Sequence, residues 1–226
     1  MHQDIYFQYK GACMMLFHRE DDEVNFLGTA FLVNPEGYLL TAAHLLSGKK
    51  DYMVVPVEET DAFAPVRTET VAPIDVEVRQ VDRKRDLALL RFKEDIDISM
   101  PDHILGVPGE APIGSSVACL GFPFGYYHIY NPLIKQAVIS AKILSDKETM
   151  IFLFDTLIHD GSRGGPLINV QDGRIIGIVS GRFHPQELLP DNLKHVSETP
   201  IRTDVSYAVS IDHAAGLMEK EEITII

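Results

Sequence analysis

A glycine-rich turn near residue 163 is the part of the chain best suited to chemistry. Residues 161–166 read Gly-Ser-Arg-Gly-Gly-Pro and lie between two apolar, strand-like runs. Glycines this dense let backbone N–H groups turn inward, where a Cβ would obstruct them. Converging N–H dipoles bind an anion, or the oxyanion that develops when a carbonyl carbon is attacked. The turn therefore predicts an anion- or oxyanion-binding loop.

A histidine and an aspartate could supply proton transfer to such a loop. His44 ends the run Thr-Ala-Ala-His after a hairpin whose turn is Asn-Pro-Glu-Gly, and imidazole titrates near neutrality. Asp86 stands directly before the buried run Leu-Ala-Leu-Leu. Taken singly, each has an ordinary explanation, because the chain has nine histidines and a single aspartate often opens a strand. Their order with the turn, His44, Asp86 and then residue 163, is more specific.

Together these segments resemble the trypsin-like (chymotrypsin-fold) serine peptidases, nearest to bacterial trypsin-like and high-temperature-requirement proteases. The resemblance rests on Gly-Tyr-Leu-Leu-Thr-Ala-Ala-His ending at His44, on Asp-Leu-Ala-Leu-Leu starting at Asp86, and on a turn close to Gly-x-Ser-Gly-Gly-Pro. It implies that His44 is the general base, that Asp86 orients it, and that residue 163 is the nucleophile. It also implies an oxyanion hole made by the N–H groups of Gly161 and Arg163. An α/β-hydrolase site fits less well, because its triad order differs and Asp160 stands where Gly-x-Ser-x-Gly needs a glycine.

One residue departs from the family pattern at the nucleophile. Arg163 stands where the serine is expected, and Ser162 lies one position too early. A guanidinium stays protonated and has no lone pair to offer a carbonyl, so the resemblance implies a serine endopeptidase whereas the chemistry predicts no cleavage. Two explanations stay open: a serine-to-arginine change that silences a protease, or a natural pseudoprotease that binds a peptide or protein without cutting it.

Substrate recognition is also implied by the resemblance. Leu157 and Ile158 fall at the base and wall of the family's specificity pocket, with Ser180 and Gly181 opposite. These residues predict an apolar pocket that prefers an uncharged residue before the scissile bond. The alternative is that Leu157 and Ile158 are core residues and that Arg182 or a neighbouring loop closes the pocket.

The pattern of short strands, broken by glycine and proline with little helical periodicity, predicts an all-β protein. By resemblance we expect two packed antiparallel β-barrels of the chymotrypsin fold and a short C-terminal helix. Residues 1–105 would form the first barrel with His44 and Asp86, and residues 106–226 the second. The second would carry the nucleophile loop 160–166 and the substrate-binding strand 177–182. Residues 5–17 are expected to end in a first strand at residues 12–17, and Asp212 is expected to cap the final helix.

The composition limits the classes of partner that the protein is expected to bind. The 226 residues include 33 acidic and 20 basic ones, giving a formal charge of −13, which argues against a nucleic-acid or anionic-membrane binder. The expected partner is a peptide or protein substrate, and the oligomeric state is left open. Cys13 and Cys119 are expected to be buried thiols, and without a signal peptide or an 18-residue apolar run the expected location is cytoplasmic. No metal or cofactor is predicted, because these loop residues match no ligand template: His159, His184, His195, Asp160 and Asp191.

Overall fold

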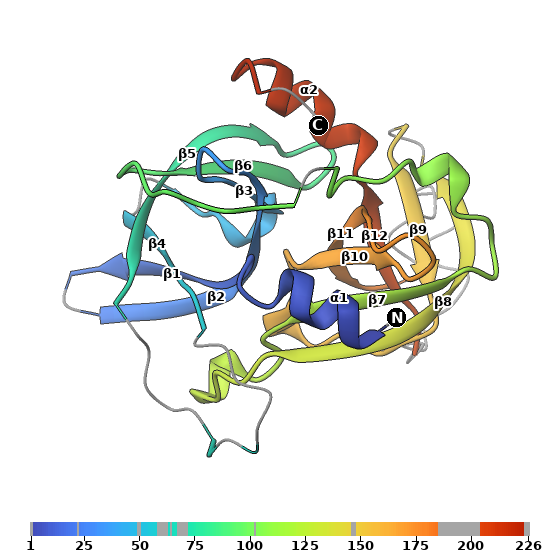
Figure 1. Cartoon of the computed structure of the whole chain (residues 1–226), viewed down its shortest axis with the longest axis horizontal. Coiled ribbons are helices and arrows are strands. Elements are labelled where there is room, and N and C mark those ends of the chain that lie inside the picture. The colour runs from blue at the N-terminus through green and yellow to red at the C-terminus, as the bar shows by residue number, and fades with distance from the viewer. Residues whose placement is uncertain are drawn as a thin grey trace, which may run out of the picture.

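The computed structural model shows two closed, six-stranded antiparallel β-barrels side by side, which confirms the predicted fold class (Figure 1). It describes residues 2–21, 23–48, 51–57, 63, 65–66, 72–101, 103–145, 148–184 and 204–223. The first barrel is built from β1 (Cys13–Glu20), β2 (Glu23–Asn34), β3 (Tyr38–Ala42), β4 (Asp51–Val55), β5 (Ile74–Asp82) and β6 (Leu87–Phe92). The second is built from β7 (Ser116–Gly121), β8 (Leu133–Leu144), β9 (Met150–Phe154), β10 (Pro166–Asn169), β11 (Ile175–Arg182) and β12 (Ser206–Ser210).

The barrels have the same strand order, and each closes by pairing its first strand with its fourth, β1 with β4 and β7 with β10. The order is β1-β2-β3-β6-β5-β4 in the first and β10-β11-β12-β9-β8-β7 in the second. Tight hairpins set the register, as in the β2–β3 turn, where Gly37 adopts a φ of 83° and the Asn34 carboxamide accepts the N–H of Glu36. This positive φ favours glycine, which explains the Pro-Glu-Gly turn seen in the sequence.

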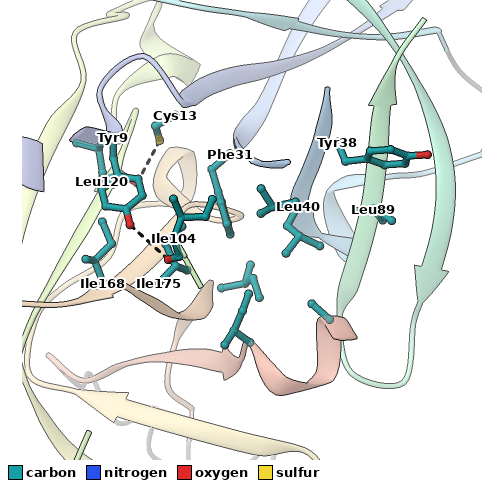
Figure 2. Packing of buried hydrophobic residues seen from close by; sticks show 14 of the residues in the cluster. Tyr9, Cys13, Phe31, Tyr38, Leu40, Leu89, Ile104, Leu120, Ile168 and Ile175 are labelled. Atoms are coloured by element: carbon teal, nitrogen blue, oxygen red, sulfur yellow. Dashed lines mark hydrogen bonds between the residues drawn. The ribbon is translucent and has the colours of Figure 1, made fainter. Parts of the chain in front are cut away.

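A shared apolar core joins the two barrels (Figure 2). Phe31, Leu40 and Leu89 of the first barrel belong to the same buried cluster as Leu120 and Ile168 of the second. All five side chains are at most 1% exposed. Because one core serves both barrels, their relative placement is fixed, and so is the geometry of residues along the seam between them.

Each terminal helix packs on the barrel that it does not belong to in sequence. The N-terminal helix α1 (His2–Tyr9) contacts β7, and the Tyr9 hydroxyl donates to the Gly173 carbonyl at 2.7 Å (Figure 2 shows Tyr9 at the core). The C-terminal helix α2 (Asp212–Glu219) packs on β5 and β6. The strands of the two barrels fall on either side of residue 105, although residue 105 itself bridges to Ile175 of the second barrel.

The first strand lies where it was expected, with β1 starting at Cys13, but no helix was predicted before it, and α1 covers His2–Tyr9. The expected cap of the final helix was wrong. The final helix is capped by Ile211 without a side-chain hydrogen bond, and Asp212 lies in its first turn. The expectation that both thiols are buried was correct, because Cys13 and Cys119 are buried and free.

Candidate active site

His44 and Asp86 meet at the end of the β3–β6 pair. His44 lies on a 3₁₀ turn, η1 (Ala43–Leu45), that directly follows β3, and Asp86 directly precedes β6. Because Ala42 pairs with Leu87, the two side chains emerge together. The Asp86 carboxylate accepts the His44 backbone N–H at 2.8 Å and lies 2.8 and 3.0 Å from His44 Nδ1. The contact occupies Nδ1 and leaves Nε2 as the ring nitrogen for proton transfer.

Two features hold this pair in place. Asp86 adopts a φ of 61°, a left-handed conformation that aspartate tolerates better than most residues. Its own carbonyl accepts the N–H of Ala43 at 3.2 Å. The Arg83 guanidinium donates to the carbonyls of Ala43 and Leu46 at 3.0 and 2.8 Å, on either side of His44. The sequence analysis missed Arg83, which lies in the charged turn before Asp86 and carries no distinguishing motif.

The glycine-rich turn is held across the seam by Thr29 of β2. The Thr29 backbone N–H donates to the Arg163 carbonyl at 2.8 Å, and its hydroxyl donates to the Gly161 carbonyl at 2.8 Å. Gly164 has a φ of 83°, and a Cβ built there would lie 2.1 Å from the Thr29 carbonyl oxygen. Only glycine fits this position. Gly164 is therefore required by packing against the first barrel, whereas a Cβ on Gly161 or Gly165 would lie 2.1 or 2.4 Å from the carbonyl oxygens of Phe122 and Leu120.

The side chain of Arg163 reaches from the turn to Gly181 of β11, the strand expected to bind substrate. Its Nη2 lies 2.7 Å from Asp160 Oδ1, and its Nε lies 3.3 Å from where a Cβ on Gly181 would be. The side chain is 34% exposed, yet Nε is buried and has no hydrogen-bond partner among the described residues. The guanidinium thus lies against Gly181, with no hydroxyl at this position to attack a carbonyl.

The expected oxyanion hole is not formed in this structure. Residues 160–162 form a 3₁₀ turn, η4 (Asp160–Ser162), in which the Arg163 N–H donates to the Asp160 carbonyl at 3.1 Å. Because that N–H is used inside the turn, it cannot pair with the N–H of Gly161 to bind an oxyanion. The expectation that Gly161 and Arg163 together form the hole is therefore not met in this conformation.

Among the residues expected to form an apolar pocket, Ile158 and Ser180 are almost fully buried. Ile158 is only 1% exposed and belongs to the core of the second barrel, the alternative noted from the sequence. Its N–H donates to Ser206 Oγ at 3.0 Å. Leu157 is half-buried, and its carbonyl accepts from the Lys135 ammonium. Ser180 is 2% exposed, and its Oγ has no partner among the described residues.

Basic residues contact this segment instead: Arg182, which the sequence analysis named as a residue that could close the pocket, and Lys135, to which it gave no role. Besides Lys135, the Arg182 Nε donates to the Ile158 carbonyl at 3.1 Å. His159 lies in the same stretch with its ring 5.3 Å from that of Phe124. Burial lowers the pKa of the His159 imidazole, and the positive charges of Lys135 and Arg182 lower it further. Lys135 lies 22 residues from Leu157 in sequence, so no local pattern could have identified it.

No group of three or more His, Cys, Asp or Glu side chains within the described ranges could hold a metal ion. His195 and Asp191, considered from the sequence, lie outside those ranges. In the same part of the chain, no helix has the length and apolar character needed to cross a membrane.

The paired barrels, with a His–Asp pair and a glycine-rich turn at their seam, define a chymotrypsin-like peptidase domain. A family profile described as "Trypsin-like peptidase domain" matches residues 28–178, more than half of the chain. The chain therefore belongs to the trypsin-like peptidase family.

Curated relatives and solved structures agree with this assignment. The chain is 30% identical over 162 residues to a probable periplasmic serine endoprotease, DegP-like, of Halomonas elongata, covering 72% of this chain and 31% of the relative. It is 28% identical to a protein of the same description from Hahella chejuensis, covering 89% and 37%. The chain thus spans about a third of the length of these relatives.

Two solved structures share the fold. The HtrA-type protease AlgW with tripeptide matches with a TM-score of 0.71 and 20% identity, over 97% of this chain and 63% of that one. The same protease with decapeptide matches with a TM-score of 0.71 and 18% identity, over 97% and 67%. At these identities the likeness is one of fold.

Proposed function

We propose that this chain binds an extended peptide and does not cleave it. The observation that carries the proposal is the state of residue 163. Arg163 offers no nucleophile, and its guanidinium lies between Asp160 and Gly181. Its N–H is bonded to the Asp160 carbonyl, so the site lacks both the attacking group and one oxyanion donor. Loss of one such donor alone slows related enzymes by about 10²–10³-fold.

The class of ligand comes from the family and its neighbours. Trypsin-like peptidases act on peptide bonds, and the two AlgW structures are named as complexes with a tripeptide and a decapeptide. An extended peptide can bind by pairing with a strand edge, which needs backbone groups and no nucleophile. Strand β11 ends at Gly181–Arg182, beside the turn, and is the edge we assign to this role.

A silenced protease is the second candidate, and the His44–Asp86 contact favours it. That pair keeps the short distances that base catalysis needs, 2.8 Å from Nδ1 to the carboxylate. The ion pair between Asp160 and Arg163 argues against a silenced protease, because a chance change to arginine would not also supply an acidic partner. Ser162 is not an alternative nucleophile in our proposal, because the residue is only 6% exposed.

The variant Arg163→Ser separates the two candidates. The protein as it stands should bind peptides, hydrolyse none, and fail to react with a fluorophosphonate probe. If the site is built for binding, Arg163→Ser is labelled weakly at most, because the Asp160 carbonyl still occupies the Arg163 N–H. Strong labelling, lost again when His44→Ala is added, would instead establish the silenced protease.

Two results contradict the proposal itself. One is hydrolysis or labelling by the unaltered protein, above all if Ser162→Ala abolishes it. The other is failure of the folded protein to bind any extended peptide. The cytoplasmic location and the absence of nucleic-acid and membrane partners stay predictions; the two curated relatives are named as periplasmic.

A further inference from the structure

Two cations contact the stretch that precedes residue 163, and Arg163 itself lies beside it over Gly181. The Lys135 ammonium donates to the Leu157 carbonyl, the Arg182 Nε to the Ile158 carbonyl at 3.1 Å, and Arg163 lies over Gly181. In a chain with a formal charge of −13, such a local excess of positive charge is unusual. Within the described part of the chain, no carboxylate lies within ion-pair distance of Lys135 or Arg182.

Among the described residues, Asp160 alone forms an ion pair with one of these cations, and that ion pair is exposed to solvent. Asp160 pairs with Arg163 at 2.7 Å, but the Asp160 side chain is 60% exposed. Exposed ion pairs contribute little, because water and salt screen them. The Arg163 Nε is buried and has no acceptor among the described residues. A guanidinium donates through five N–H groups and prefers a carboxylate that takes two of them at once, so Asp160 leaves Arg163 only partly satisfied.

We propose that the Lys135–Arg163–Arg182 cluster receives a carboxylate of the bound peptide, which replaces Asp160 as the partner of Arg163. This inference rests on the proposed peptide-binding function. The carboxylate can belong to an acidic side chain at the position that faces Gly181, or to the free C-terminus of the peptide. Lys135 and Arg182 add attraction without direct contact, because both are half-buried and lack carboxylate partners in the described residues.

This proposed preference for an acidic group differs from the preference for an uncharged residue expected from the sequence. Leu157 and Ile158 predict an apolar pocket, but Ile158 is buried in the core and the carbonyls of both residues accept from cations. A Lys or Arg side chain would meet like charge at this place. An aliphatic side chain would leave the Arg163 Nε without an acceptor. An acidic group is the chemistry that meets the positive charge and pairs with the exposed part of the Arg163 guanidinium.

The test compares matched peptides on the ¹⁵N-labelled full chain. The probes are alanine hexapeptides, acetylated at the N-terminus and amidated at the C-terminus, with Glu, Gln, Leu or Arg at the fourth position. A further acetylated peptide ends at the Gln of the fourth position with a free C-terminal carboxylate. Binding is followed by NMR at the Gly181 amide and the Arg163 Nε–H. We expect the Glu or the free-acid peptide to bind about 5-fold more tightly than the blocked Gln peptide at low salt, with the difference shrinking as salt rises. Whichever peptide gains affinity identifies the source of the carboxylate.

Variants of the three cations show whether the Lys135–Arg163–Arg182 cluster causes the preference for a carboxylate. Arg163→Gln should abolish the preference, and Lys135→Gln should reduce it. Lys142→Gln is the matched control, because Lys142 lies on the same strand and donates to the Pro108 carbonyl at 2.8 Å, away from the cluster. Equal binding of the blocked Glu, blocked Gln and free-acid peptides, or a preference that survives Arg163→Gln, overturns this inference and leaves peptide binding intact. Failure of every peptide to bind overturns both.

Discussion

Thr29 of β2 holds the glycine-rich turn through hydrogen bonds, and its replacement should destabilise both the turn and the folded protein. The hydroxyl is fully buried; it donates to the Gly161 carbonyl at 2.8 Å and accepts the Phe122 N–H at 3.3 Å. Thr29→Val keeps the side-chain volume but leaves both buried backbone groups without this partner. At about 1–3 kcal/mol for each buried group left unsatisfied, and less for the longer contact, we expect a loss of about 2–4 kcal/mol in the free energy of unfolding.

The assay is equilibrium denaturation, with Thr29→Ser as the control. Serine keeps the hydroxyl and removes one methyl group, which should cost about 1 kcal/mol. For a chain of this length, a loss of about 2–4 kcal/mol lowers the melting temperature by about 5–15 °C. If Thr29→Val costs no more than Thr29→Ser, the hydroxyl does not hold the turn, and our account of how the barrels position the site is wrong.

Two further predictions concern the turn and the C-terminal helix. Gly164→Ala should lower the free energy of unfolding by about 3 kcal/mol or more, because its Cβ would lie 2.1 Å from the Thr29 carbonyl oxygen. The control is Gly114→Ala, at a φ of 93° with open space around it, which should cost only about 1 kcal/mol in the same denaturation experiment. His213 Nε2 accepts the Met150 N–H at 2.8 Å, and burial, with the charge of Arg85, lowers the pKa of the His213 imidazole. The neutral imidazole therefore stabilises the folded protein fully above the unfolded pKa near 6.5. This contribution to the free energy of unfolding is lost as pH falls through the lower folded pKa. Stability measured from pH 7.5 down to 5 should therefore fall more steeply in the unaltered protein than in His213→Gln, and parallel curves would contradict this assignment.

Much of the architecture could be predicted because it rests on local patterns. The strand β6 was visible as the buried run Leu-Ala-Leu-Leu, and the β2–β3 hairpin as a Pro-Glu-Gly turn whose glycine has a positive φ. The order of His44, Asp86 and the turn, read with the family resemblance, was enough to expect the two side chains to meet. In the structure the Asp86 carboxylate lies within hydrogen-bond distance of the His44 ring.

Other features could not be predicted because they depend on distant contacts or on single dihedral angles. Helix α1 gains its stability from the second barrel, through the Tyr9 hydroxyl and the Gly173 carbonyl, and eight residues of mixed polarity give no helical signal alone. Whether the Asp160 carbonyl faces the Arg163 N–H depends on the backbone of one short turn, which the same sequence could close or open. The cation at Leu157 comes from β8, a different strand.

The loss of the nucleophile is compatible with an intact fold because residue 163 supports the structure through its backbone. Its carbonyl accepts the Thr29 N–H, its N–H donates to Asp160, and the neighbouring Gly164 N–H donates to the Val179 carbonyl at 2.7 Å. None of these bonds involves a side chain at position 163, so serine and arginine meet the same structural requirement. Selection on the fold would then leave this position free to change. What changes with the side chain is the chemistry: a serine hydroxyl is a nucleophile, which the closed turn leaves without one oxyanion donor, whereas a guanidinium beside Gly181 can only attract and hold a negative group.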